Sequence, residues 1–576
     1  MNALQPIYTL ATECQDCYKC IRGCPVKAIK VEGGYASIEP HRCLFCGHCV
    51  EVCPNGAKKV RDDQPRVERL LRSTRPVIAS LAPSFASDFP GVTSAQMVAA
   101  LLRLGFQAVS ETALGAQEVS ARCRDLLASG RALPASGRAP VLISSACPVV
   151  VDYIRKYRPD CTDLIAPLLS PMLAHARLLR REYEDASVVF IGPCIAKKGE
   201  ADRHPELVDA ALTFEDLRNW LERAGIHPDE IEPGDAAFVP RAAGTGAFYP
   251  IEGGMIEGLR QPDSDTLFMA YSGLRGVARA LDGLEDLRPS QPLFLELLAC
   301  EGGCVNGPKT AGSVGTVRRN CRVLRYARMG DDAPVGLPIE AGYTPEPPPR
   351  PSASETQIRD VLRSVGKSSP QDEVNCGGCG YDSCRAFASA FLMGRAERRM
   401  CVTYMRKLAE KKTHALMQKM PSAVVLVDEN LRILECNPSF ARFFAESDLE
   451  DAQPRALEQQ SLDTLVPFHN LFRGVLESGE EILGRDIRFQ ERVFHVTIFS
   501  VERHAVVGGI FRDETQPAIH KEQIIGRARR VIENNLRTVQ QIAYLIGENA
   551  AESEIALNAI VDSFSPESID EHGQPE

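Results

Sequence analysis

Most of the 20 cysteines in this 576-residue chain fall into short clusters, and clustered thiols bind metal or carry out redox chemistry. The first 60 residues contain the run Cys14-x-x-Cys17-x-x-Cys20-x-x-x-Cys24-Pro25, which returns as Cys43-x-x-Cys46-x-x-Cys49-x-x-x-Cys53-Pro54. Small steps between thiols let a short loop wrap a compact metal cluster, and the proline turns the chain away after each run. We therefore expect metal-bound thiolates here rather than disulfides.

The repeated run resembles the bacterial ferredoxin signature, in which each run gives three thiolates to one 4Fe-4S cluster and its fourth to the other. The resemblance implies one cluster on Cys14, Cys17, Cys20 and Cys53, and a second on Cys43, Cys46, Cys49 and Cys24. Zinc is the alternative, but two identical runs with eight thiols in total fit it poorly.

Further cysteines follow apolar, strand-like runs between about Arg66 and Arg328. Such runs occur at 76–81, 141–145, 188–191 and 293–297. Because helical stretches separate them, they predict a mostly parallel α/β sheet, whose ligands gather at the carboxyl ends of its strands. Three of these runs lead directly into cysteines, at Ala146-Cys147-Pro148, at Gly192-Pro193-Cys194 and at Ala299-Cys300 through Cys304.

These three motifs resemble those of the iron-only (FeFe) hydrogenases, in the same order and downstream of a double ferredoxin. The family motifs T-S-C-C-P, M-P-C-x-x-K-x-x-E and E-x-M-x-C-x-x-x-C correspond to Ser144–Pro148, Gly192–Glu200 and Glu296–Cys304. The attached modules described below make the chain similar to the sensory, PAS-containing type of this family.

The resemblance implies an H-cluster, a 4Fe-4S cubane bridged to a diiron unit that carries carbonyl and cyanide. Its ligands would be Cys147, Cys194, Cys300 and Cys304, with Cys304 as the bridge. Lys197 matches the family lysine that donates to a cyanide, since a buried anionic ligand needs a fixed cationic donor. Glu200 completes that motif, and Ala82-Pro83-Ser84 resembles the loop beside the diiron unit.

Departures from the family concern proton transfer. The family carries a proton-shuttling cysteine just before the first ligand, and this chain has Ala146, which holds no exchangeable proton. Gly192 and Leu298 replace two methionines that usually pack around the diiron unit. The acidic relay of the family has no clean match, so we expect slow turnover. Cys123, Cys161 and Cys321 lie outside every motif, and we interpret them as buried structural cysteines.

A proline-rich stretch at 331–354 predicts a semi-rigid linker. Beyond an expected helix at Thr356–Val365, a further thiol set resembles the small helical domain that carries one more 4Fe-4S cluster, with zinc as the alternative. Its members are Cys376, Cys379, Cys384 and Cys401.

The cysteine clusters stop at about Lys412, where Met420–Phe440 resembles the opening hairpin and first helix of a PAS domain. Later strands are expected at Val493–Val501 and Ala505–Phe511. The sequence names no PAS ligand. A helix is predicted from Lys521 to Phe564, with apolar residues at seven-residue spacing. Its apolar face packs on the PAS domain, forms a homodimer seam or docks a separate effector, and these alternatives stay open.

Composition excludes other classes of protein. The chain is 44% hydrophobic and 25% charged with a net charge of −10, and this mild acidity argues against nucleic-acid binding. We expect no membrane span and no signal peptide at Met1–Leu10, and hence a cytoplasmic location.

The predicted fold class is multidomain, α/β and α+β. The expected parts are a two-cluster ferredoxin domain (1–60), an α/β H-cluster domain (66–330), the linker (331–354), a helical 4Fe-4S domain (355–411), a PAS domain (412–516) and a C-terminal helix with a disordered tail (517–576).

The favoured hypothesis is a slow hydrogenase that senses dihydrogen or redox state and signals through its PAS domain to a separate kinase, phosphatase or regulator. Its reaction would be reversible dihydrogen oxidation with a ferredoxin-type partner, and diiron-assembly proteins would mature it. The alternatives are a metabolic ferredoxin-coupled hydrogenase and a non-catalytic iron–sulfur electron-transfer protein without the diiron unit.

Overall fold

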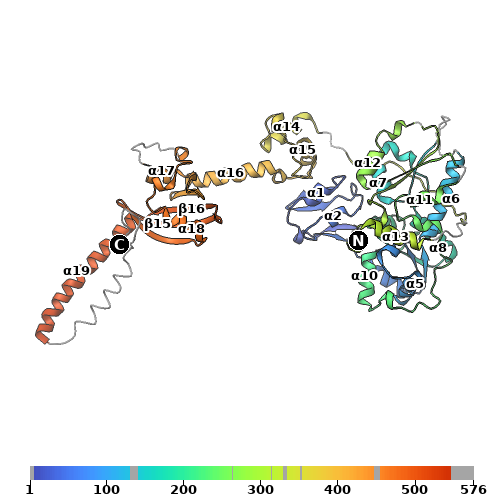
Figure 1. Ribbon diagram of the computed structural model, residues 1–576, viewed down its shortest axis with the longest axis horizontal. Helices are drawn as coiled ribbons and strands as arrows, with labels where there is room; N and C mark the ends of the chain where they lie inside the picture. The colour runs from blue at the N-terminus through green and yellow to red at the C-terminus, as the bar shows by residue number, and fades with distance from the viewer. Residues whose placement is uncertain are drawn as a thin grey trace. The chain divides into compact units, whose positions relative to one another are not determined.

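A computed structural model describes residues 5–129, 140–261, 264–287, 289–312, 314–327, 334–349, 353–445 and 454–546 (Figure 1). The chain divides into two compact units, Met1–Tyr404 and Met405–Glu576. The predicted tail and the predicted helical stretch from 547 to 564 lie outside the described residues.

The first cysteine-rich segment folds as two similar halves, each with a short helix beside its cysteine run. Its elements are β1 (Ile7–Thr9), α1 (Lys19–Gly23), β2 (Ile29–Glu32), β3 (Tyr35–Ile38), α2 (His48–Glu51) and β4 (Lys58–Val60). β1 pairs with β4 and β2 pairs with β3, both antiparallel. Because β1 and β4 lie near the two ends of the segment, their pairing closes it.

Two separate parallel sheets, rather than the single sheet expected, form the core of the next domain. One has the order β6-β5-β8-β9 and the other β10-β11-β7. Their strands are β5 (Val77–Leu81), β6 (Ala108–Glu111), β7 (Val141–Ile143), β8 (Ser187–Gly192), β9 (Ala210–Thr213), β10 (Leu267–Ser272) and β11 (Leu293–Leu298). All residues of β5, β8 and β11 are buried, as expected for parallel strands covered by helices. Apolar runs predict strands, but not which strands share a sheet.

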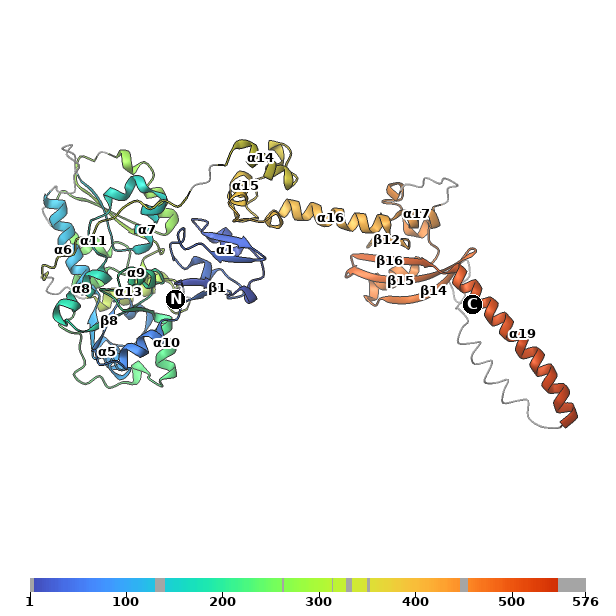
Figure 2. The same cartoon turned by 180° about the vertical axis from the view of Figure 1, so that it is seen from behind.

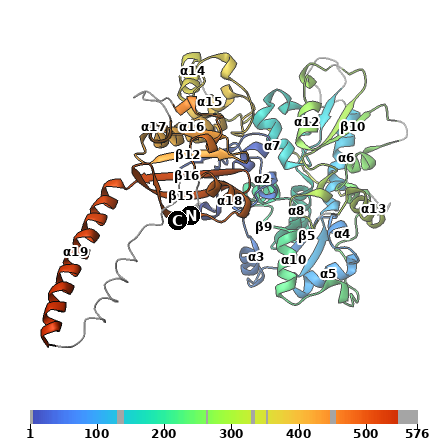
Figure 3. The same cartoon turned by 60° about the vertical axis from the view of Figure 1, so that its left-hand side comes forward.

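Helices cover both sheets. Figure 3 shows α5 and α10 with β5 and β9 at one end of this domain, and α12 with β10 at the other. The helices are α3 (Gln64–Leu71), α4 (Phe85–Asp88), α5 (Ser94–Arg103), α6 (Ala113–Ser129), α7 (Pro148–Tyr157), α8 (Pro171–Glu182), α9 (Ala196–Arg203), α10 (Phe214–Arg223), α11 (Gly254–Leu259), α12 (Leu274–Ala280) and α13 (Thr316–Tyr326).

The described part of the proline-rich stretch, 334–349, lies against the sheet domain instead of hanging free. Leu337 and Ile339 are buried, and the Ile339 carbonyl accepts a hydrogen bond from Leu169 N at 2.8 Å. The Glu118 carboxylate accepts from the backbone N–H groups of 335–337. The expected semi-rigid linker thus packs against the sheet domain over these residues, where alternating apolar side chains anchor it.

A small helical module follows, with α14 (Glu355–Ser364), α15 (Cys384–Leu392) and the start of α16 (Val402–Lys419). Val361 and Leu362 on α14 pack with Ala388 on α15.

The second unit holds one antiparallel sheet of order β13-β12-β16-β15-β14 (Figure 2). Its elements are β12 (Ala423–Asp428), β13 (Ile433–Cys436), α17 (Pro438–Phe444), α18 (Asn470–Ser478), β14 (Ile482–Phe489), β15 (Arg492–Glu502), β16 (Val506–Asp513) and α19 (Thr515–Ile546). Phenylalanines fill its core, and Phe444 lies 4.8 Å from Phe440 and 5.1 Å from Phe511 between ring centroids. Sequence reasoning missed β14, because its residues are mostly exposed or half-buried and give no apolar run.

Candidate iron–sulfur and hydrogenase site

Each predicted H-cluster cysteine follows the carboxyl end of a strand. Cys147 is the N-cap of α7 after β7, Cys194 follows β8, and Cys300 and Cys304 follow β11. β7 and β11 are neighbours in one sheet, whereas β8 belongs to the other. The two sheets therefore supply ligands from two sides of a common space.

That space is a partly open cavity with about 1010 Å³ free of protein atoms, a volume that includes its solvent-filled mouth. All four cysteines line it, together with Lys197, Ala146 and Cys46 from the first segment. Four thiols around a volume of this size suit a polynuclear iron–sulfur group, and the structure thus brings together every cysteine that the resemblance assigned to the cubane.

Burial disfavours the free thiolates of these cysteines. It raises the pKa of Cys194 to about 11 and raises the pKa values of Cys147, Cys300 and Cys304 as well. The charge of Lys197 lowers the pKa values of Cys147, Cys194 and Cys304. The thiols therefore need a bound metal to deprotonate, and Lys197 is the nearby cation that favours their charged form.

Lys197 is buried on α9 and has polar partners. Its Nζ donates to Glu200 Oε2 at 2.6 Å and to Ser170 Oγ at 3.0 Å. One turn of helix separates the lysine and the glutamate, so the second motif holds its own ion pair. Glu200 thus orients Lys197 rather than lining the cavity itself, and sequence reasoning missed Ser170.

The Ala82-Pro83-Ser84 loop borders the same cavity, directly after β5. Ser84 is 1% exposed, and within the described residues its Oγ has no hydrogen-bond partner. A buried hydroxyl left without a partner costs free energy unless a bound group satisfies it. This orphaned hydroxyl therefore fits a ligand that accepts hydrogen bonds.

Residues at the departures from the family pattern also line the cavity. Ala146 and Leu298 lie in its wall. A Cβ at Gly192 would lie 2.6 Å from Cζ of Phe190, so the Phe190 ring fills the space that a larger side chain would need. Two methionines still line the cavity, Met172 from α8 and Met255 from α11.

Glu296 is a second carboxylate of interest. Sequence reasoning named it only as the first residue of the third motif. It lines the cavity, is 2% exposed and accepts a hydrogen bond from Ile256 N at 3.2 Å. Burial raises its pKa to about 7, despite lowering contributions from backbone N–H groups. This carboxyl therefore exchanges a proton near neutral pH.

A hydrogen-bonded row lies behind another part of the wall. Thr112, which lines the cavity, places Oγ1 2.8 Å from Ser80 Oγ, and Ser80 Oγ lies 2.7 Å from Nδ1 of His175. Burial lowers the pKa of His175 to about 3, so its ring is neutral at physiological pH. Sequence reasoning missed this row, because its members come from three segments that are far apart in the chain.

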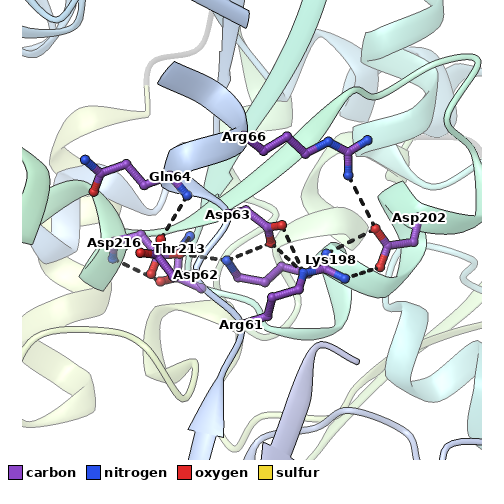
Figure 4. Close-up of polar contacts among 9 residues, drawn as sticks. All are labelled: Arg61, Asp62, Asp63, Gln64, Arg66, Lys198, Asp202, Thr213 and Asp216. Atoms are coloured by element: carbon purple, nitrogen blue, oxygen red, sulfur yellow. Dashed lines mark hydrogen bonds and ion pairs between the residues drawn. The ribbon is translucent and has the colours of Figure 1, made fainter. Parts of the chain in front are cut away.

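Lys198, next to Lys197, belongs to a buried charge network shown in Figure 4. Its Nζ lies 3.1 Å from Asp63 Oδ2 and 2.8 Å from Asp216 Oδ2. Arg61 pairs with Asp63 and, at 2.7 Å, with Asp202. The segment between the first module and α3 is thereby tied to α9 and α10.

The structure places members of the two predicted ferredoxin-type sets near one another. Burial raises the pKa of Cys20 to about 11, with smaller contributions from the neighbouring thiols of Cys14, Cys17 and Cys53. Burial likewise raises the pKa of Cys49, which lies among Cys24, Cys43 and Cys46. Cys20 and Cys49 thus have as electrostatic neighbours the cysteines expected for their own clusters.

The third thiol set lines a smaller, partly open space of about 320 Å³ in the helical module. Cys376, Cys379, Cys384 and Cys401 line it together. Asn375 Oδ1 accepts from Cys384 N at 2.8 Å and holds the start of α15 beside this space. The volume and the four thiols fit one small cluster.

Among the remaining cysteines, Cys123 and Cys161 are buried as expected, but Cys321 on α13 is exposed. The interpretation of Cys321 as a buried structural residue is therefore wrong.

Comparisons with known proteins agree with this arrangement. The family model described as iron only hydrogenase large subunit, C-terminal domain, matches residues 75–308, and a 4Fe-4S dicluster domain matches 6–54. A putative Fe-S cluster model matches 372–403, and a PAS fold matches 411–511. The part of the chain at 75–308 belongs to the iron-only hydrogenase family.

Relatives of this hydrogenase-family chain include the NADP-reducing hydrogenase subunit HndD of Solidesulfovibrio fructosivorans, 28% identical over 52% of this chain and 61% of HndD. The periplasmic Fe hydrogenase large subunit of Nitratidesulfovibrio vulgaris is 25% identical over 51% of this chain and 84% of that protein. The chain thus spans about three fifths of HndD. A solved FeFe-hydrogenase structure, HydA(deltaEFG), is 18% identical with a TM-score of 0.40, covering 50% of this chain and 100% of that one.

None of the helices in the described ranges combines the length and the apolar character needed to cross a bilayer.

Proposed function

We propose that this iron–sulfur chain is a hydrogenase-type sensor of low turnover, which responds to dihydrogen or to the electron state that dihydrogen imposes. The observation that carries the proposal is the cavity itself. Four cysteines, Lys197 and an orphaned Ser84 hydroxyl line it, while Ala146 stands at the position of the proton shuttle.

The group proposed for this cavity is an H-cluster on Cys147, Cys194, Cys300 and Cys304, with Cys304 as the bridge to the diiron unit. When bound, it supplies the reversible conversion of dihydrogen into two protons and two electrons. Lys197, fixed by Glu200 and Ser170, offers a cationic donor to an anionic ligand of the diiron unit, and Ser84 offers a hydroxyl donor. The Ala82-Pro83 segment shapes the wall beside it.

Ala146 limits the rate in this proposal. A methyl group neither gives nor accepts a proton, so proton transfer at this point depends on water or on other groups of the wall. Binding of dihydrogen with slow turnover suits a receptor better than a bulk catalyst. The PAS module would then pass the state to a separate kinase, phosphatase or regulator.

Three further 4Fe-4S clusters complete the proposed cofactor set, on the two ferredoxin-type sets and on Cys376, Cys379, Cys384 and Cys401. Cys46 lines the same cavity as Cys300, so the second ferredoxin-type set adjoins the H-cluster socket. A ferredoxin-type partner and diiron-assembly proteins are the proposed partners for electrons and maturation.

A metabolic hydrogenase is the second candidate, favoured by the hydrogenase names of the relatives. It predicts turnover as fast as that of family enzymes with the shuttle cysteine.

The deciding experiment is the infrared spectrum of the protein matured with diiron-assembly proteins. Carbonyl and cyanide bands, together with slow dihydrogen turnover, are the expected result. Fast turnover would favour the metabolic candidate, and absence of the bands after maturation would favour a non-catalytic electron-transfer protein.

A further inference from the structure

Two ligand loops that lie far apart in the sequence pack directly against each other in the first unit. Gly380, which follows Cys379, has φ +94°, and a Cβ there would lie 2.7 Å from Cγ2 of Ile21. Ile21, which follows Cys20, is fully buried. Backbone therefore meets side chain with no room for an added atom, between the Cys14–Cys24 loop and the Cys376–Cys401 loop.

Arg22 connects the same two loops by hydrogen bonds. Its Nη2 donates to the Cys17 carbonyl at 3.0 Å, and its Nη1 donates to the Gly378 carbonyl at 3.1 Å. One guanidinium thus holds one carbonyl from each loop, a fork geometry that arginine provides and lysine does not.

Buried contacts fix the surrounding docking surface. Arg395 is 6% exposed, and its guanidinium contacts Glu39 Oε2 at 2.5 Å and the Lys27 carbonyl. Val31 N donates to the Arg395 carbonyl at 3.0 Å, which adds a backbone bond to the β2 edge. The helical module is therefore docked on the ferredoxin-like module, and Arg22 lies at the exposed edge of this contact.

Gly378 also touches the beginning of α16. A Cβ on Gly378 would lie 2.8 Å from Cγ2 of Val402, the first residue of that helix. Cys401, a member of the third thiol set, immediately precedes Val402. A displacement of Gly378 toward Val402 would therefore press against the first turn of α16.

The other end of α16 is held by the PAS module. The Asn437 side chain is completely buried, and its Nδ2 donates to the Met417 carbonyl at 3.2 Å and to the Ser422 carbonyl at 2.8 Å. Its Oδ1 accepts from Val424 N in β12 and from Phe440 N in α17, both at 2.9 Å. One side chain thus ties the end of α16 to the first strand and the first helix of the PAS fold.

We propose that Arg22 is a positioning residue that couples the redox state of the Cys14, Cys17, Cys20 and Cys53 site to α16, and through α16 to the PAS module. The electrostatic reason is simple. One-electron reduction adds a negative charge to the group that these cysteines hold, which strengthens the pull on the guanidinium toward the Cys17 loop and weakens its bond to Gly378. The identity of the natural electron donor, dihydrogen, rests on the proposed function, whereas the coupling itself does not.

The test is hydrogen–deuterium exchange of the full-length, iron-loaded protein, kept anaerobic, as isolated and after reduction by dithionite. Wild type should show a reduction-dependent change in exchange across 402–425. Arg22→Ala should shrink that difference at least fivefold. Arg22→Lys should give an intermediate value, because an ammonium is a compact point charge without the fork.

The matched control is Arg363→Ala, which removes an exposed arginine of α14 in the same module, where it pairs with nearby Asp360. It should respond like wild type. Gly378→Ala probes the other half of the connection and should alter the response even with Arg22 in place. A wild-type-sized response in Arg22→Ala, or no reduction-dependent change in wild type, would overturn the proposal.

Repeating the exchange under dihydrogen separates this coupling from the proposed function. A response to dithionite but not to dihydrogen supports the coupling and contradicts the sensor. Infrared changes under dihydrogen without any response of α16 support the sensor and contradict the coupling.

Discussion

At the scale of single residues, the wall of the main cavity has the lysine of the family motif, Lys197, but it has Ala146 at the position that corresponds to the family's proton-shuttling cysteine. Lys197 keeps both of its partners, Glu200 and Ser170, at 2.6 and 3.0 Å, so its ammonium is held in place whether or not the site turns over. Ala146, by contrast, offers only a methyl group and a backbone N–H, which is already donated to Ser144 Oγ at 3.2 Å. Binding and proton transfer are therefore separable properties here.

Ala146→Cys should raise turnover of the matured protein by roughly 100-fold, because a positioned acid–base group typically contributes a factor of 10² to 10⁴. The measurement is dihydrogen evolution and uptake, normalised to the infrared carbonyl bands. Ala116→Cys is the matched control, since Ala116 lines the same cavity. Equal or lower activity of Ala146→Cys would contradict the assignment of this position.

Glu296 predicts a pH dependence of stability. Its carboxyl has a pKa of about 7 in the folded state against an ordinary value of 4.5, so the folded state holds its proton more tightly than the unfolded chain does. The stability from this group is complete below pH 4.5 and is lost as the pH rises through 7, by about 3 kcal/mol in total. Glu296→Gln should therefore flatten the fall in thermal midpoint between pH 5 and pH 8. An unchanged slope would show that this carboxyl does not titrate in that range.

At the scale of elements, the carboxyl ends of three strands determine where the predicted H-cluster cysteines lie. The apolar runs before Cys147, Cys194 and Cys300 predict strands that end at the ligands, and β7, β8 and β11 do end there. The distribution of these strands over two sheets was not predictable, because a buried parallel strand has the same apolar sequence in either sheet. Ser170 and Phe190 escaped notice for a related reason. A serine at a helix start and an aromatic inside a strand have ordinary structural roles until the fold brings them to the cavity.

The junction between the ferredoxin-like module and α9 depends on Lys198, whose side chain is completely buried between Asp63 and Asp216. Lys198→Ala should cost roughly 3–5 kcal/mol, because removing one partner leaves buried carboxylates without their cation. Urea unfolding, followed by proteolysis near residues 60–66, measures this loss. Lys59→Ala is the control, since its pair with Glu13 is about 40% exposed on both sides and should change stability by less than about 1 kcal/mol. Similar losses of stability in Lys198→Ala and Lys59→Ala would argue that the buried charge network of Lys198 contributes no more than an exposed ion pair.

At the scale of the whole molecule, the modular organisation was predictable from cysteine spacing, because each ligand set is local in sequence or repeats a known pattern. The docking of the modules was not. Nothing in the local sequence pairs Arg395 with Glu39, or Leu337 with the sheet domain, since such contacts depend on tertiary structure. A proline-rich composition predicts a semi-rigid linker at 331–354, but it does not reveal that Leu337 and Ile339 are buried against the sheet domain.

If the third thiol set carries its own 4Fe-4S cluster, it can be emptied without emptying the others. Cys376→Ala removes an exposed member of that set, so the ferredoxin-like and hydrogenase cores should stay intact. We expect a loss of about four irons per chain, with no loss of zinc, because one such cluster holds four irons on four thiolates. Cys321→Ala, an exposed cysteine outside every set, should leave the iron content unchanged. Elemental analysis and the electron paramagnetic resonance spectrum of the reduced protein measure both. Loss of a single zinc ion from Cys376→Ala would instead make the set a structural zinc site, and α16 would then begin at a metal that cannot change its redox state.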